Sequence, residues 1–364
     1  MITASTQTRQ PAAESIPPRA AWQRELARAI SDPRELLQLL GLADDADGGA
    51  HGPAAQAALA GAQFRLRVPR GFVGRMRRGD PRDPLLLQVL PGARELVELP
   101  GFGSDPLGER AAMRAPGLLH KYHGRALLIT TGACAVHCRY CFRREFPYED
   151  GMAEGRWRRA LAAIAADQSI EEVILSGGDP LSLSDARLGQ LTDALRGVAH
   201  VRRLRLHTRT PVVLPERIDA GFMRWLAALP WPTVIVLHSN HAREIDDSVR
   251  TATARMRAAG ATLLNQSVLL AGINDSVPAL EALSHALWSA QVLPYYLHLL
   301  DRVRGSAHFE VSEDTARELM AALAARLPGY LLPRLAREQA GAPAKTLVAS
   351  AAWDIAHSPR RVEC

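Results

Sequence analysis

The chain has 364 residues, of which 47% are hydrophobic and 23% are charged. These values are typical of a soluble globular protein and exclude collagen-like, mainly disordered and coiled-coil classes. The sequence contains no run of about 18 apolar residues, so it predicts no membrane-spanning helix. Lys and Arg number 44 against 38 Asp and Glu, giving a net charge of +6. Because this excess is small and spread along the chain, it favours solubility and small anionic ligands over nucleic acid.

The first third of the chain predicts a leader and a helical lobe. Residues 1–20 are polar and lack the apolar core of a secretory signal, so we expect a disordered leader and a cytoplasmic protein. Residues 22–42 carry apolar positions at helical spacing, and Asp32-Pro33 begins a second helix. Residues 48–53 predict a loop. We assign residues 21–115 to an N-terminal helical lobe, since many prolines and glycines break its second half.

From residue 125 onward, short apolar runs alternate with amphipathic segments. The six apolar runs cover residues 126–131, 172–176, 203–207, 233–238, 262–269 and 295–300. Alternation of strands and helices predicts an α/β fold of parallel strands joined by right-handed crossovers. Six units, not eight, predict an incomplete (β/α)6 barrel of TIM type over residues 116–311, with its chemistry on the loops at the carboxyl ends of the strands.

Helix signals lie between and after these runs. Ser184 is placed to cap a helix that ends at Gly197. Pro215 is placed to begin another, with Ile218 in register with the apolar residues that follow. Ser312 is placed to cap a helix over residues 313–327, within a C-terminal segment that spans residues 312–364.

Three of the four cysteines lie within eight residues, in the spacing C-x3-C-x2-C directly after the first predicted strand. They are Cys134, Cys138 and Cys141. Three soft thiolates in one loop suit an iron-sulfur cluster that leaves one iron free to bind another molecule. A structural zinc site takes four protein ligands, so it would need His137 or a distant group to complete it. We interpret Cys364 as an incidental terminal thiol.

The spacing, with Tyr140 before the last cysteine, resembles the signature of the radical S-adenosylmethionine enzymes. The resemblance implies a [4Fe-4S] cluster whose free iron binds S-adenosylmethionine, which is cleaved to a 5′-deoxyadenosyl radical. The second predicted strand ends in Gly177, Gly178 and Asp179, which resemble the motif of that family that holds the methionyl ammonium. Glycines admit a close approach of the backbone to a ligand, and a carboxylate pairs with a cation. Without this context the segment would predict only a turn.

Lys345 follows a stretch of small residues in a chain that mostly uses arginine. A Schiff base needs a primary amine, which arginine cannot supply. Without further context, an exposed loop lysine is the alternative interpretation.

Several stretches together resemble the lysine 2,3-aminomutase family, and within it the bacterial branch that makes (R)-β-lysine for elongation factor P. These stretches are residues 66–70, 116–123, 138–144 and 335–338. The short tail after Lys345 fits the same branch, because the catabolic enzymes have a longer C-terminal extension involved in zinc binding and assembly. The family combines S-adenosylmethionine and a [4Fe-4S] cluster with pyridoxal 5′-phosphate.

The resemblance implies a role for each matching residue. The three cysteines would hold the cluster, and Lys345 would bind pyridoxal phosphate covalently as a catalytic residue. Lys121, Tyr122 and Arg125 match a stretch that contacts pyridoxal phosphate, and Gln266 matches a segment near S-adenosylmethionine. The predicted substrate-binding residues are Arg143 for the substrate carboxylate and both Asp301 and Glu338 for the far amino group. Glu338 stands where the catabolic enzymes usually have aspartate.

The implied reaction moves the amino group of L-lysine from the α- to the β-carbon. The substrate displaces Lys345 from pyridoxal phosphate, the radical removes a hydrogen atom from the β-carbon, and the nitrogen migrates through a three-membered ring. The resemblance also implies an external electron donor, such as flavodoxin or ferredoxin, and an elongation factor P lysyl ligase that uses the product. It implies no nucleic acid and no membrane, and leaves a homo-oligomer open.

Three alternatives remain at this point. A metabolic lysine 2,3-aminomutase would make (S)-β-lysine, and a related aminomutase would act on another amino acid such as glutamate. The acidic residues Asp301 and Glu338 argue against glutamate. A cluster-bearing electron carrier or nucleic-acid-binding iron-sulfur protein would use three cysteines, but it would need neither Lys345 nor the glycine motif.

Overall fold

The computed structural model describes residues 20–42, 53–148 and 155–349. The predicted leader, most of the predicted loop at 48–53, the end of the C-terminal segment and Cys364 lie outside the described residues. None of the helices in the described ranges combines the length and the apolar character of a membrane-spanning helix.

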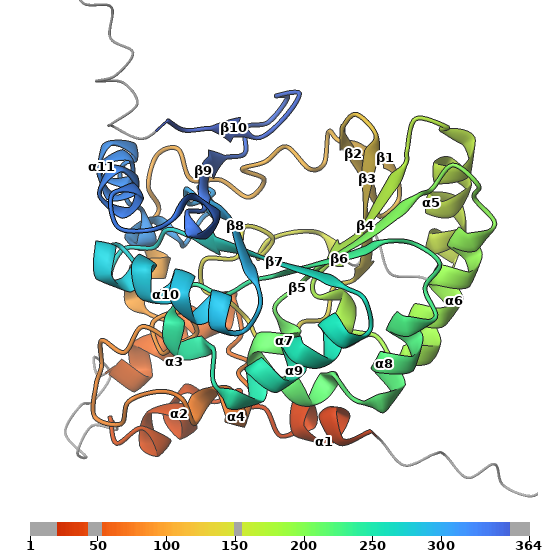
Figure 1. The fold of residues 1–364 in the computed structure, drawn as a ribbon. Helices are drawn as coiled ribbons and strands as arrows, with labels where there is room; N and C mark the ends of the chain where they lie inside the picture. Colours follow the sequence, from red (N-terminus) through yellow and green to blue (C-terminus); the bar gives the residue numbers. More distant parts are fainter. Residues whose placement is uncertain (1–19, 43–52, 149–154, 350–364) are drawn as a thin grey trace, which may run out of the picture.

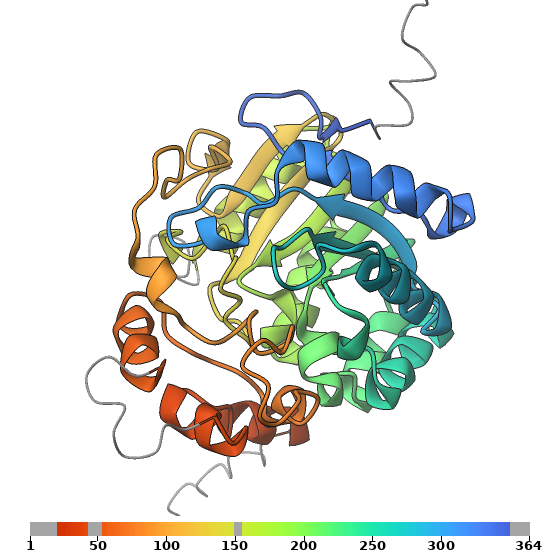
Figure 2. The ribbon, with the colours of Figure 1, turned by 90° about the vertical axis from the view of Figure 1, so that its left-hand side faces the viewer.

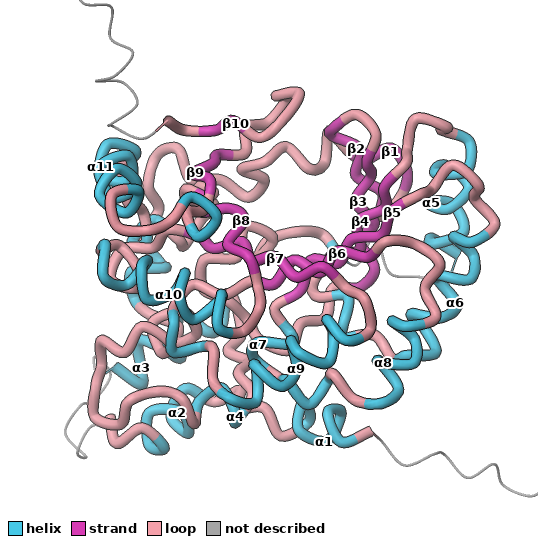
Figure 3. Tube along the Cα trace, in the orientation of Figure 1, coloured by secondary structure: helices cyan, strands magenta, loops and turns pink. Residues whose placement is uncertain are grey.

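Ten strands form one open sheet in the order β1 to β10 (Figures 1 and 3). Their bounds are β1 Met113–Ala115, β2 Leu118–Tyr122, β3 Arg125–Thr131, β4 Glu172–Gly177, β5 Arg203–Thr208, β6 Thr233–Leu237, β7 Thr262–Val268, β8 Leu293–His298, β9 Arg334–Arg337 and β10 Thr346–Leu347. Strands β3 to β9 pair in parallel. The six predicted runs correspond to β3 to β8, so the predicted incomplete α/β barrel is confirmed.

Antiparallel strands extend this parallel sheet at both ends. The hairpin of β1 and β2 pairs with β3, and β10 pairs with β9. The sheet therefore continues from the predicted N-terminal lobe into the predicted C-terminal segment. Figure 3 shows that the strands form an arc whose two ends face each other across an opening.

Most of the helices cover the outer side of this arc, whereas α1 to α4 lie together at one end of the molecule (Figure 1). The helices are α1 Ala21–Ala27, α2 Pro33–Leu39, α3 Pro53–Gln63, α4 Arg70–Val73, α5 Gly155–Ala166, α6 Asp185–Arg196, α7 Thr210–Val213, α8 Ala220–Ala227, α9 Asp247–Ala258, α10 Val277–Ser289 and α11 Glu313–Ala324. The side chains of Ser184 and Ser312 accept hydrogen bonds from the first turns of α6 and α11, as their positions predicted.

The helix predicted from Pro215 is wrong at its start. Pro215–Arg217 forms a single 3-10 turn, and α8 begins only at Ala220. The side chain of Asp219 accepts a hydrogen bond from the backbone N–H of Phe222, so Asp219 is the N-cap. Ile218, which the pattern placed in the helix, is buried in the preceding turn. A capping carboxylate therefore outweighs a proline as the start signal here.

Two apolar clusters hold the arc and the N-terminal helices in place. The larger one fills the space between the sheet and its outer helices, with side chains such as Leu128, Leu175 and Leu206 fully buried. The second joins N-terminal side chains such as Phe72 to Ala135 and Val136 in the cysteine segment. Figure 2 shows the N-terminal helices gathered at one end of the molecule. The N-terminal region therefore supports the loop that carries the cysteines.

Candidate active site

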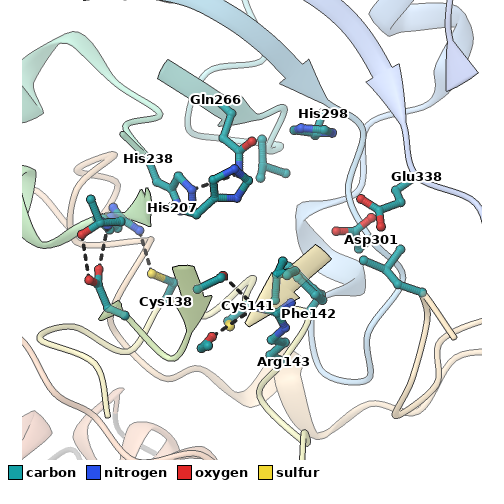
Figure 4. A pocket seen from close by; sticks show the side chains of 18 of the residues that line it. Cys138, Cys141, Phe142, Arg143, His207, His238, Gln266, His298, Asp301 and Glu338 are labelled. Atoms are coloured by element: carbon teal, nitrogen blue, oxygen red, sulfur yellow. Dashed lines mark hydrogen bonds between the residues drawn. The ribbon is translucent and has the colours of Figure 1, made fainter. Parts of the chain in front are cut away.

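A cavity of about 720 Å³ lies within the arc (Figure 4). All fourteen residues that the sequence singled out line it. They are Lys121, Tyr122, Arg125, Cys134, Cys138, Cys141, Arg143, Gly177, Gly178, Asp179, Gln266, Asp301, Glu338 and Lys345. Figure 4 shows Cys138 and Cys141 on one side of the cavity, and Asp301 and Glu338 on the other. The fold therefore brings the cysteine loop and the C-terminal lysine to one site.

The cysteine loop follows β3 and presents three free thiols to the cavity. Burial raises the pKa of Cys134 well above its ordinary value, and Asp179 and the other two thiols raise it further. Burial also raises the pKa of Cys141 to about 11, with Cys138 contributing. A metal centre reverses this effect, because a bound cation deprotonates its thiol ligands.

Three soft sulfur donors in one loop fit an iron-sulfur cluster, in which each thiolate binds its own iron. No three Cys, His, Asp or Glu side chains of the described ranges are arranged to hold one metal ion. Nη1 of Arg209 donates a hydrogen bond to Sγ of Cys138 at 2.8 Å. Hydrogen bonds to cluster sulfurs are one means by which a protein tunes such a centre.

No motif in the sequence indicated Arg209. Three residues from other parts of the chain hold it in position. Nη2 donates to Oε1 of Gln88 at 2.7 Å and to Oε2 of Glu244 at 3.0 Å. The two carboxylate oxygens of Asp179 accept hydrogen bonds from Thr208 Oγ1 and Leu181 N, and from the backbone N–H of Arg209 and Thr210. Asp179 therefore orders the loop after β5, which holds Arg209 beside the thiol.

The two glycines at the end of β4 also have a packing reason that the sequence did not show. A Cβ at Gly177 would lie 2.4 Å from the carbonyl oxygen of Thr131, and one at Gly178 would lie 2.4 Å from that of Ala133. The Cβ direction is thus blocked by the end of β3 at Gly177 and by the start of the cysteine loop at Gly178. The glycines let β4 pack directly against both segments, while still lining the cavity.

Lys345 and Lys121 are the only two lysines of the chain, against 42 arginines. Both contact Glu338, with Nζ of Lys121 at 2.9 Å from Oε1 and Nζ of Lys345 at 3.4 Å from Oε2. Burial alone would raise the pKa of Glu338, but the two lysines lower it to about 2. Glu338, predicted to bind a substrate ammonium, is therefore ionised and already holds two ammonium groups.

The lysine side of the cavity has groups that fit pyridoxal phosphate. Lys345 offers a primary amine, and Nζ of Lys345 lies 5.3 Å from the centre of the Tyr296 ring. Arg125 and Arg205 line the same cavity, and the guanidinium of Arg125 lies 4.7 Å from the centre of the Tyr122 ring. Amine, cations and aromatic faces together suit an aldehyde that carries a phosphate.

Much of this wall comes from the strands and not from the loops at their carboxyl ends. Arg125 begins β3, Arg205 lies within β5 and Tyr296 lies within β8. Asp301 and Glu338 lie in the segments that follow β8 and β9, and strand side chains complete the lysine side of the cavity. An open arc leaves its inner face accessible, whereas a closed barrel fills that space with side chains.

Arg143 forms a buried ion pair that the sequence did not predict. Nε and Nη2 donate to the two oxygens of Glu109, each at 2.7 Å, while Nη1 donates to Oγ of Ser176 and to the carbonyl oxygen of Gly177. Glu109 also lies 3.7 Å from Nζ of Lys121. A lone glutamate in a loop carries no motif, so only the fold reveals this pairing.

Glu109→Ala should destabilise the protein strongly. Both side chains of the pair are about 5% exposed, so the variant leaves the Arg143 guanidinium buried with its main partner removed. We expect the free energy of unfolding to fall by about 3–5 kcal/mol in urea denaturation. Glu281→Ala is the matched control, because Glu281 pairs at the surface with Arg326 and its loss costs about 1 kcal/mol or less. Equal losses in the two variants would contradict this account.

Asp301 is a carboxylate without a partner. Its side chain makes no hydrogen bond or ion pair with any residue that the structure describes, although it lines the cavity. Burial raises its pKa from 3.8 to about 7, and the negative charge of Glu338 contributes. Among the described residues this carboxylate therefore has no ion-pair partner, and its charge develops near neutral pH.

Asp301→Asn should stabilise the protein in a pH-dependent way. The folded carboxyl group binds its proton more tightly than the unfolded one, so wild-type stability falls as the pH rises from about 4 to 7. Asparagine has no charge to bury. We expect the advantage of the variant in free energy of unfolding to grow by about 3 kcal/mol between pH 5 and pH 8. Urea denaturation at both pH values measures this, and a pH-independent difference would be contrary to it.

Three histidines that the sequence analysis did not single out also line the cavity. Nε2 of His238 lies 2.9 Å from Nε2 of Gln266, and the ring of His207 meets that of His238 edge to face. Nε2 of His298 lies 3.2 Å from Nζ of Lys345. Figure 4 shows His207, His238 and Gln266 close together, with His298 on the side of Glu338. Each histidine stands alone in the sequence, so no spacing indicated this group.

Comparison with known proteins agrees with this geometry. Residues 128–268 match the family model of the radical SAM superfamily. The chain is 48% identical over 337 residues to an L-lysine 2,3-aminomutase of Escherichia coli (strain K12), which covers 91% of this chain and 95% of that one. It is 46% identical over 329 residues to the Haemophilus influenzae enzyme of the same name, with 90% and 95% covered.

A more distant relative has the same name. The L-lysine 2,3-aminomutase of Clostridium subterminale is 34% identical over 287 residues, which cover 78% of this chain and 69% of that one. Membership of the radical SAM superfamily implies a [4Fe-4S] cluster and S-adenosylmethionine. The chain therefore belongs to the L-lysine 2,3-aminomutase family of the radical SAM superfamily, and it is an isomerase that works as a radical SAM aminomutase.

Proposed function

We propose that the protein converts L-lysine into (R)-β-lysine, with pyridoxal phosphate on Lys345, and that the product serves the modification of elongation factor P. One observation carries the proposal. A single cavity contains the three thiols, the primary amine of Lys345 and two carboxylates, Asp301 and Glu338. A substrate with an amino group at each end needs such an arrangement of charges.

The cluster and S-adenosylmethionine would bind at Cys134, Cys138 and Cys141. When bound, they supply a 5′-deoxyadenosyl radical that removes a hydrogen atom from the substrate. Pyridoxal phosphate, held by Lys345 with Lys121, Tyr122 and Arg125 around it, supplies a conjugated π system that stabilises an unpaired electron. The chain itself binds, orients and encloses the reacting groups.

Arg143 binds the substrate carboxylate with a limited set of donors. A guanidinium has five N–H groups, and Glu109, Ser176 and Gly177 already accept four of them. The remaining N–H is on Nη2. The substrate carboxylate therefore receives a single hydrogen bond from Arg143, and the fork is held still by Glu109.

Asp301 and Glu338 bind the ε-ammonium group of the substrate. Asp301 is free to accept it, whereas Glu338 must exchange one of its two lysine contacts. Because the carboxyl group of Asp301 has a pKa of about 7, its charge and its attraction for the ammonium increase as the pH rises from 6 to 8. Two acidic groups at this end also argue against glutamate as the substrate.

The stereochemistry of the product tests the proposal. The protein is purified without oxygen, reconstituted with iron and sulfide, supplied with pyridoxal phosphate, S-adenosylmethionine and a reductant, and incubated with L-lysine. Chiral chromatography should yield (R)-β-lysine. The (S) product would instead assign the protein to metabolic β-lysine synthesis. Absence of β-lysine from a sample with an intact cluster and bound pyridoxal phosphate would contradict L-lysine as the substrate.

The proposed setting follows from the same reaction. In the cytoplasm, a flavodoxin or ferredoxin would deliver the electron that the cluster needs, and an elongation factor P lysyl ligase would consume (R)-β-lysine. Feeding the purified product to that ligase and weighing elongation factor P by mass spectrometry tests this link. If elongation factor P stays unmodified, its modification is not the use of this enzyme's product.

A further inference from the structure

Lys345 is held in the cavity by side chains more than by its backbone. It directly precedes β10, which has only two residues, both exposed, and lies at the edge of the sheet. Strand β10 pairs with β9 alone. The lysine stem has four flexible carbons, so the direction of Nζ depends on the groups that it meets.

Nζ of Lys345 meets one anion and one ring nitrogen at close range. Oε2 of Glu338 lies at 3.4 Å and Nε2 of His298 at 3.2 Å. Other groups that act on Lys345 through their charges are Asp301, His207 and His238. His298 is therefore the histidine that contacts the amine directly. His238 is hydrogen-bonded to Gln266, and the ring of His207 packs against that of His238.

The strand register places His298 for this contact. His298 ends β8 and pairs with Ala336 on β9, while Ala336 pairs with Leu347 on β10. The three strands thus carry His298, Glu338 and Lys345 to the same side of the cavity. Only 9% of His298 is exposed, and burial keeps its pKa well below 6.5, with Lys345 lowering it further. Its imidazole is therefore neutral at physiological pH.

A neutral imidazole and a carboxylate have opposite effects on an amine that must react with an aldehyde. Glu338 favours the ammonium form, which has no lone pair for attack. The imidazole accepts a hydrogen bond without adding negative charge, so it holds Nζ in place and competes with Glu338. Overall, an ammonium and an aldehyde give a protonated carbon-nitrogen double bond and one molecule of water.

We propose that His298 is a positioning residue for Lys345, whose Nζ it holds by a hydrogen bond opposite Glu338 so that the amine faces an aldehyde ligand in the cavity. This inference rests on the proposed attachment of pyridoxal phosphate to Lys345. It adds to that proposal the group that makes the attachment fast.

The test measures covalent attachment and not turnover. Full-length protein without pyridoxal phosphate is mixed with it at pH 7.5, the carbon-nitrogen bond is reduced with cyanoborohydride at timed intervals, and peptides are weighed by mass spectrometry. Only two lysines exist in the chain, and the peptide masses distinguish label on Lys345 from label on Lys121. The wild-type chain is therefore the background protein for all measurements.

His298→Phe keeps a ring but removes the acceptor, and His298→Gln places an amide oxygen near the position of Nε2. Loss of a hydrogen bond to a charged group should slow labelling of Lys345 by about tenfold or more in the Phe variant. The Gln variant should stay within about threefold of the background protein. His285→Phe, at an exposed histidine of α10, is the matched control and should label at the background rate.

The outcomes separate the inference from the proposed function. If Lys345 of the background protein does not react faster than a free lysine side chain, the proposed attachment fails and the inference fails with it. If Lys345 reacts but His298→Phe labels at the same rate, the attachment stands and the inference is overturned. Equal slowing in the Phe and Gln variants, with unchanged circular dichroism, also overturns it. If His298→Phe does not fold, His298→Ala replaces it in the same comparison.

Discussion

Cys138→Ala is expected to lose the iron-sulfur cluster and, with it, all cleavage of S-adenosylmethionine. Three thiolates are the only cysteine ligands that the loop offers, and two cannot hold a four-iron cluster with one further open iron. Cys138 is also the thiol that accepts the hydrogen bond from Arg209. Iron and sulfide content after anaerobic reconstitution, together with 5′-deoxyadenosine production under reducing conditions, measure both effects.

Cys364→Ser is the matched control for this variant, because Cys364 lies outside the C-x3-C-x2-C motif. It should retain the iron content and the 5′-deoxyadenosine yield of the wild type. A full complement of iron in Cys138→Ala, or a comparable loss in Cys364→Ser, would show that the loop thiols are not the cluster ligands.

Lys345→Arg is expected to abolish covalent attachment of pyridoxal phosphate and the formation of β-lysine. Arginine keeps the positive charge beside Glu338, so the ion pair is preserved while the primary amine is lost. Reduction with borohydride followed by mass spectrometry should then find no added mass. The amount of β-lysine formed from L-lysine should fall below the detection limit.

Lys121→Arg is the matched control. It makes the same change in the other lysine, which also contacts Glu338. It should keep the covalent adduct, now on Lys345 alone. An adduct that persists in Lys345→Arg and disappears in Lys121→Arg would show that pyridoxal phosphate is attached to Lys121. That result would contradict the proposed site.

Strands β3 to β8, six of the seven parallel strands, were predictable because each is a short apolar run that is bounded by turns and followed by a helix signal. Strands β1, β2, β9 and β10 were not, since they have two to five residues and acquire their pairing from neighbours far along the chain. The wrong start at Pro215 has a similar cause. Proline and aspartate both favour helix starts, and tertiary packing decides between them.

The candidate site could be predicted where residues form a motif, and not where they act through a partner in space. The cysteine spacing and the glycine segment indicated one end of the cavity, and Lys345 the other. Glu109, Arg209 and His298 were missed, because each is a single residue whose importance depends on contact with Arg143, Cys138 or Lys345. Such contacts depend on where the open arc places its strands and loops in space.

Some predicted residues also make structural contacts that the sequence did not show. Gly177 makes room for the end of β3 and Gly178 for the start of the cysteine loop, while Asp179 binds backbone N–H groups. Glu338 holds two lysines in addition to facing the cavity. A residue type in a pattern indicates that a position is constrained, whereas the neighbours determine which physical constraint applies.

The central claim is that the cysteine loop and Lys345 serve one reaction. Its most direct test is to follow a hydrogen atom from L-lysine to 5′-deoxyadenosine. L-Lysine deuterated at the β-carbon is incubated with the reconstituted enzyme, and 5′-deoxyadenosine is weighed by mass spectrometry. We predict that deuterium appears in 5′-deoxyadenosine with wild type and is absent with Lys345→Arg. Formation of 5′-deoxyadenosine without deuterium in the wild type, or equal deuterium in both proteins, would contradict the account.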